Sequence, residues 1–237
     1  MFFRLLIVIM RLLFLALFVF PITLLAQGDI NQLDPQGERH GVWQKMYPNS
    51  KQLRYEGQFD HGKEVGVFKF YCEDCENVPT ATKEFNATNA IAKVNYFTSK
   101  GKLVSEGEMD AKERIGEWVY YHKKGAAVMT RESYSNGEIS GLKITYYPNG
   151  EVAEELNYEH GKMNGANKYF APNGTLLKDL SYTDNKLDGT AVYYDERGQK
   201  SIEGVYRDDK KHGNWKYYKN GKFHHEETFP KPRKKVN

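Results

Sequence analysis

A glycine recurs at a nearly fixed interval through most of this 237-residue chain. The recurring glycines are Gly41, Gly66, Gly116, Gly141, Gly165, Gly189 and Gly213. The steps between them are 25, 50, 25, 24, 24 and 24 residues, so the longest step is either a doubled unit or one unit with an insertion. A fixed period of this length is typical of repeat architectures, in which each unit packs chiefly on its neighbours.

Each unit has the sequence pattern of two strands. Its first half ends in a pair of adjacent aromatic residues or close substitutes, as at Tyr120 and Tyr121. Its second half carries an acidic residue three places before an aromatic or apolar one, as at Glu203 and Tyr206. Because side chains alternate between the two sides of a strand, we expect the two aromatic residues of a pair on opposite faces of a sheet.

Turn sequences separate the two halves of a unit. Asn-Gly occupies this place at Asn149–Gly150, Asn173–Gly174 and Asn220–Gly221. This dipeptide predicts a two-residue hairpin turn, in which both residues adopt positive φ angles. A second polar turn, such as residues 159–162, closes the unit.

The predicted fold is all-β, an elongated single-layer antiparallel meander of tandem β-hairpins. About seven units would occupy residues 41–229, with an irregular second unit at 66–115. Residues 27–40 would form an N-terminal linker, and residues 230–237 a basic, disordered tail.

The repeated elements resemble a known family. The pattern of Gly213, Trp215, Tyr217 and Tyr218, followed by Asn220–Gly221, is similar to MORN repeats. The 24-residue spacing resembles the bacterial MORN variant of YwqK-type antitoxin-like proteins, and the likeness extends from residue 41 to about 229. The resemblance implies a hairpin array without catalysis of its own that contacts proteins or membranes, and, for this subgroup, an antitoxin-like role.

The first 26 residues have the layout of a secretory signal peptide. Arg4 and Arg11 are their only charges, and an apolar run leads to Ala26, so we expect cleavage between Ala26 and Gln27. Arg11 interrupts the apolar stretch, which favours a cleaved signal over a retained membrane anchor. Translation from Met1 or from Met10 would both leave such a signal. We therefore expect export to the periplasm, the outer surface or the medium, without a cysteine for lipidation.

The charge balance argues against nucleic acid as a partner. The formal net charge is +3 for the whole chain, and it becomes +1 without the two arginines of the signal. Four of the remaining positive charges lie in the last seven residues, so the body of the chain is mildly acidic. Such a body has no surplus of cations to neutralise many phosphates.

Cys72 and Cys75 are the only cysteines, and they stand where other units place a turn. In an oxidising compartment this spacing favours a local disulfide, with free thiols, redox chemistry and metal binding as alternatives. The segment from residue 76 to about residue 92 that follows is either a binding loop or a degenerate extra hairpin, and the extra hairpin is favoured.

No arrangement of catalytic residues can be assembled from this sequence. The seven histidines fall mostly in or beside turns, and the acidic residues recur with the repeat, which marks them as scaffold. We find no nucleophile and base pattern, no paired histidines on a helix and no phosphate-binding glycine loop. The prediction is a protein that is not an enzyme and has neither a cofactor nor a metal site.

Packing is the favoured role of the aromatic ladders, and they also supply the candidate binding residues. An exposed aromatic surface commonly marks a partner site. We expect a protein partner on a face lined by Trp118, Tyr120, Tyr193, Trp215 and Tyr217. The alternatives are a membrane or cell-wall ligand held by aromatic rings through cation-π attraction, and neutralisation of a toxin. The oligomeric state and the identity of the partner are left open.

Overall fold

The computed structural model describes residues 29–231 apart from residues 76 and 87. In this part of the chain every regular element is a β-strand, and no helix is long and apolar enough to span a membrane. The predicted signal peptide, its cleavage point and the end of the basic tail lie outside the described residues. The strands are β1 (Gln32–Leu33), β2 (Arg39–Met46), β3 (Leu53–Asp60), β4 (Lys63–Phe70), β5 (Ala81–Phe85), β6 (Ile91–Phe97), β7 (Leu103–Asp110), β8 (Glu113–Tyr121), β9 (Val128–Ser135), β10 (Glu138–Ile139), β11 (Gly141–Tyr146), β12 (Val152–Glu159), β13 (Lys162–Met163), β14 (Gly165–Phe170), β15 (Leu176–Thr183), β16 (Lys186–Tyr194), β17 (Lys200–Arg207), β18 (Lys210–Lys219) and β19 (Lys222–Phe229).

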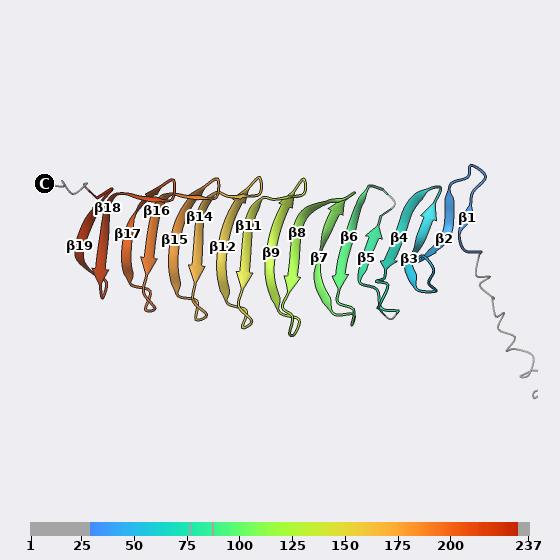
Figure 1. Ribbon diagram of the computed structural model, residues 1–237, viewed down its shortest axis with the longest axis horizontal. Helices are drawn as coiled ribbons and strands as arrows, with labels where there is room; N and C mark the ends of the chain where they lie inside the picture. The colour runs from blue at the N-terminus through green and yellow to red at the C-terminus, as the bar shows by residue number, and fades with distance from the viewer. Residues whose placement is uncertain (1–28, 76, 87, 232–237) are drawn as a thin grey trace, which may run out of the picture.

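The strands form one antiparallel meander, as predicted. Apart from the short strands β10 and β13, each strand pairs with the next along the chain, and Figure 1 shows the hairpins in a single row with turns along both long edges. The short strand β10 precedes β11 with a break of one residue, and both pair with β9. In the same way β13 precedes β14, and both pair with β12. The predicted N-terminal linker is partly ordered, because β1 pairs with the start of β2 and covers the end of the row.

The described residues contain eight hairpins, one more than the glycine spacing indicated. Both β4–β5 and β6–β7 lie within the 50-residue step, so the irregular second unit is two hairpins. Ala92 stands where the third hairpin would carry its opening glycine. A count of glycines therefore misses this hairpin.

The opening glycines create a bulge in each junction between hairpins. Gly116 and Gly189 have φ angles of 63° and 108°, a region that strongly favours glycine. Opposite Gly116 the register shifts between Glu106 and Glu108, which bends the strand. At Ala92 the β5–β6 register runs without a shift, so this junction differs from the others.

The Asn-Gly turns are of two kinds. Asn220 and Gly221 both have positive φ angles, 51° and 71°, as predicted. At Asn149–Gly150 and Asn173–Gly174 the prediction is wrong, because only the glycine has a positive φ angle. There Asn149 uses its side-chain oxygen to accept the N–H of Glu151, and the glycine forms the bulge of a longer loop. Several turns between hairpins have the two positive φ angles instead, as at His61 and Gly62.

The two faces of the sheet differ in chemistry. We call one the aromatic face, defined by the row two residues after each opening position: Trp43, Phe68, Val94, Trp118, Lys143, Asn167, Ala191 and Trp215. We call the other the charged face, defined by the row of cross-strand neighbours Gln44, Glu56, Lys69, Thr82, Asn95, Glu106, Val119, Arg131, Ile144, Glu155, Lys168, Asp179, Val192, Glu203, Lys216 and Glu226.

The aromatic face holds the core, although no second layer covers it in the described residues. Trp118 and Trp215 are fully buried, and their indole N–H groups donate to the backbone oxygens of Glu108 and Val205 at 3.0 and 3.1 Å. Tyr206 meets the Trp215 ring edge-on, with centroids 4.9 Å apart. Each tryptophan is thus packed against the strand before it, and the core runs along the row of hairpins.

Residue size is matched between neighbouring hairpins. A Cβ atom added at Gly107 or Gly204 would overlap the ring of Trp118 or Trp215, so each large ring requires a glycine on the preceding strand. Where the row carries the small Ala191, the preceding strand places Leu180 directly opposite. The pairs Gly204 with Trp215 and Leu180 with Ala191 are therefore two solutions to the same packing problem.

This matching predicts a compensating double substitution. We expect Gly204→Leu and Trp215→Ala each to destabilise the protein, the first by overpacking of about 1–3 kcal/mol and the second by a cavity of about 3–5 kcal/mol. The double variant reproduces the Leu180 and Ala191 pair, so it should be more stable than the sum of the two losses predicts. Urea denaturation of the four proteins measures this coupling, and strictly additive losses would contradict the matching.

Candidate functional site

The predicted binding residues all lie on the aromatic face, but they do not form one open surface. Trp118 and Trp215 are fully buried, whereas Tyr120, Tyr193 and Tyr217 are half-buried. They also belong to two separate clusters, one around Trp118 and one around Trp215. The tryptophans must therefore be removed from the candidate contact residues, because packing between hairpins already covers them.

Cations of the protein itself cover the tryptophan rings. In each case the cation stands two residues before the opening glycine of the hairpin. Arg39 lies 5.1 Å from the ring centroid of Trp43, Arg114 lies 4.5 Å from that of Trp118, and Lys211 lies 4.2 Å from that of Trp215. A ligand cation would have to displace these groups, which argues against a cation-binding aromatic cage at the tryptophans.

A polar interruption divides the aromatic row at Lys143 and Asn167. Lys143 Nζ lies 3.0 Å from a carboxylate oxygen of Glu132, whose side chain is 13% exposed. Burial raises the pKa of Glu132, but hydrogen bonds from Tyr134 and Lys143 outweigh burial and hold this pKa below its usual range. Asn167 is fully buried, and its side-chain nitrogen has no hydrogen-bond partner among the described residues. The spacing from the opening glycines identifies both positions, but it does not predict their partners.

The charged face carries most of the exposed large apolar side chains. Each of them neighbours in sequence a residue of the aromatic face, so it projects to the opposite side. They are exposed by 37–48% and stand among the acidic and basic groups of the charged row. They are Val42, Val67, Val104, Met129, Leu142 and Val205.

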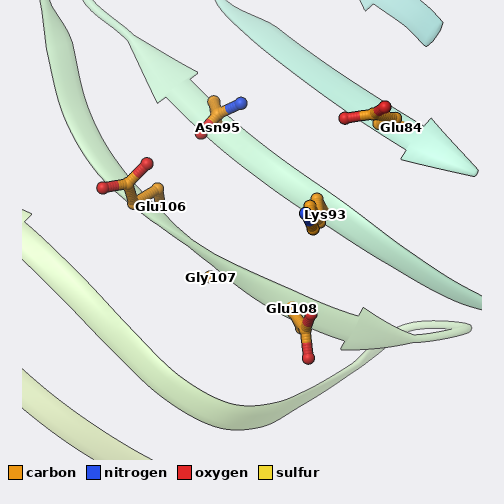
Figure 2. Close-up of a pocket in the computed structure, with 6 residues that line it drawn as sticks. All are labelled: Glu84, Lys93, Asn95, Glu106, Gly107 and Glu108. Carbon is orange, nitrogen blue, oxygen red and sulfur yellow. The ribbon is translucent and has the colours of Figure 1, made fainter.

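A shallow acidic pocket of about 290 Å³ lies on the charged face over β5, β6 and β7. Figure 2 shows its lining side chains on these three neighbouring strands. Glu84, Glu106 and Glu108 contribute three carboxylates against the single ammonium group of Lys93. The pocket includes strands of the β5–β6 junction, the one where the register does not shift. Its charge suits a basic side chain.

A mainly apolar hollow of about 570 Å³ adjoins the acidic pocket at the loop edge of β7 and β8. Leu103, Tyr121 and Ala126 line it. The hydroxyl of Tyr121 donates a hydrogen bond to Glu106, which lines the acidic pocket. The Glu106–Tyr121 pair therefore forms a common wall between an acidic and an apolar depression. Sequence reasoning missed this site, although the acidic residue and the aromatic residue each obey the repeat.

Cys72 and Cys75 form a disulfide in the loop between β4 and β5. Their Cα atoms are 5.2 Å apart, within the usual range for such a bond. Tyr71, beside this loop, is buried and donates its hydroxyl to Glu56 at 2.9 Å. Burial and this hydrogen bond raise the pKa of Tyr71 to about 12. The loop of the second hairpin is thus fixed to β3 of the first hairpin.

The fold and this surface define a β-hairpin repeat protein. In a comparison with protein families, residues 139–160 match the MORN repeat variant. These residues begin at the end of β10 and run through the hairpin of β11 and β12. No curated protein matches the chain. MORN repeats generally mediate contacts with proteins or membranes and are generally not enzymes.

Removal of a cation from a tryptophan should lower stability. We expect Lys211→Ala to reduce the free energy of unfolding by about 0.5–2 kcal/mol, because Lys211 covers Trp215 and contacts Tyr217. The neighbouring Lys210→Ala is the matched control, since Lys210 is exposed at the start of β18. Denaturation monitored by tryptophan fluorescence measures both, and equal losses would show that the ring contact contributes nothing.

The oxidation state of the two cysteines can be measured directly. We expect the protein isolated without reductant to resist alkylation at Cys72 and Cys75, and to take up two alkyl groups after reduction. Mass spectrometry distinguishes these states. Two alkylated thiols before reduction would contradict the disulfide in the native compartment.

Proposed function

We propose that this chain is a non-catalytic repeat scaffold that binds a protein partner in the cell envelope or outside the cell. The observation that carries the proposal is the combination of the acidic pocket, the adjoining apolar hollow and exposed Val104 on one face. Such a surface matches a partner segment with a basic residue next to an apolar one. The apolar leader of residues 1–26 supports the proposed location.

The shape of the pockets favours a macromolecule over a small substrate. The depressions are shallow and lie on a sheet surface rather than between layers. Small-molecule sites are usually concave and bury most of the ligand. A partner that lies across the strands would fill both depressions with side chains of one segment. The exposed Met129 and Leu142 extend the same face toward β9 and β11.

Site-specific photo-crosslinking in intact cells tests this proposal. We expect a photoreactive amino acid at Val104 or Met129 to capture a protein of defined mass. The same group at Tyr193, on the aromatic face, is the matched control and should capture little. Charge reversal by Glu108→Lys should weaken capture about tenfold or more by opposing a basic partner residue.

The other outcomes separate the competing functions. Capture only from Tyr193 would move the binding surface to the aromatic face and contradict the proposed one. Crosslinks to lipid or wall fragments without protein would replace the proposal with envelope-ligand binding. A captured toxin would give the scaffold an antitoxin-like role, which deletion of the two genes singly and together then tests. Cell fractionation locates the protein independently of its partner.

A further inference from the structure

Two imidazoles and one carboxylate meet at the turn edge of the first hairpin. His40 lies in β2, Asp60 ends β3, and His61 follows in the turn to β4. Asp60 Oδ1 is 3.6 Å from His40 Nδ1 and 3.9 Å from His61 Nε2. One donor atom from each residue lies within 4.8 Å of the others. All three side chains are exposed, so a solvated ion can reach them.

A fourth residue orients one of the imidazoles. Asp34 Oδ2 is 2.6 Å from His61 Nδ1, and its other oxygen accepts the N–H groups of Gln36 and Glu38. The Asp34 side chain is only 2% exposed, so the loop holds it in place. When a carboxylate accepts a hydrogen bond from the Nδ1–H group of a histidine, Nε2 is left as the ligand atom, which is the usual outer-shell arrangement at metal sites.

We propose that His40, Asp60 and His61 bind a divalent first-row transition metal ion, with Asp34 as the outer-shell partner of His61. Imidazole nitrogen with a carboxylate suits Zn²⁺ and its neighbours rather than Ca²⁺ or Mg²⁺, which prefer all-oxygen shells. Ligand atoms bound to Zn²⁺ at about 2.0–2.2 Å lie roughly 3.4 Å from one another in a tetrahedron. The two separations from Asp60, 3.6 and 3.9 Å, are close to this value, and the three atoms together lie within 4.8 Å, so the imidazoles must move closer together to share one ion. Three protein ligands leave a fourth position open.

The site would join three successive segments at the N-terminal end of the array. Asp34 belongs to the turn between β1 and β2, while the three ligands come from β2, the end of β3 and the turn after it. Metal binding would therefore fasten the covering segment to the first hairpin. A matched turn elsewhere lacks the set, since His160 there has Ser140 where the first hairpin has His40. The first hairpin lies at the opposite end of the row from β18 and β19 (Figure 1).

A competition titration of Zn²⁺ against a chromophoric chelator tests the site. The protein is purified as the full chain without a polyhistidine tag. We expect one Zn²⁺ per chain, with affinity reduced at least about tenfold in His40→Ser and in His61→Asn. These replacements copy Ser140, which precedes the fifth hairpin, and Asn136, which follows the fourth and adopts a positive φ angle like that of His61. The fold should therefore be retained, which far-UV circular dichroism checks.

Two control variants and one independent measurement decide the result. His160→Asn makes the same change in a turn with a single imidazole and should leave Zn²⁺ affinity unchanged. The double substitution His224→Ala with His225→Ala removes the adjacent pair in β19 and should also have no effect. Shifts of the His40 and His61 imidazole resonances during Zn²⁺ titration of the wild type give a readout without mutation. No saturable binding, unshifted resonances at these two residues, or loss of binding only in the His224 and His225 variant would overturn the proposal.

Discussion

The contact between a large ring on one hairpin and the strand before it is the interaction on which this structure depends. A sheet without a covering layer can form a core only from side chains on one of its own faces. Here the large rings on the aromatic face are buried by side chains of the adjacent strands. Trp215 shows how: Gly204 makes room beneath the ring, Tyr206 meets its edge and Lys211 covers it. Because every such contact joins adjacent hairpins, stability is built up along the row, as in other repeat proteins.

Much of this arrangement follows from the sequence, because local signals and the period agree. The alternation of Tyr120 and Tyr121 predicts their opposite faces, and Tyr121 indeed contacts Glu106 on the charged face while Tyr120 contacts Arg114 on the other. A count of glycines alone misses the third hairpin, since Ala92 replaces the glycine that marks the others, whereas the expected extra hairpin in the long step is present. Packing is the favoured role of the aromatic ladders, but the sequence does not indicate which rings are fully buried, because that burial depends on groups brought by neighbouring strands. A residue pattern identifies a face, but not what covers it.

The same packing decides which surface is left for a partner. On the aromatic face the tryptophan rings are covered by arginines, lysines and tyrosines of the protein itself. Little ring surface is therefore left there for a partner to contact. On the charged face Val104 and Met129 stay exposed, and the carboxylates around Lys93 outnumber the local cations. The β5–β6 junction, where Ala92 replaces the opening glycine and the register does not shift, contributes both of its strands to the acidic pocket. The irregular part of the array therefore also differs in its surface chemistry.

The polar interruption limits how far the core is continuous. The clusters around Trp118 and Trp215 do not share members, and Lys143 and Asn167 occupy the row between them. Burying the Lys143–Glu132 pair and the side-chain nitrogen of Asn167 costs free energy that an aromatic ring at either position would not. Between the two clusters the buried Leu156 of β12 and the backbone hydrogen bonds of β11 to β14 join the two ends of the array, so we expect this middle segment to be the least stable part of the core.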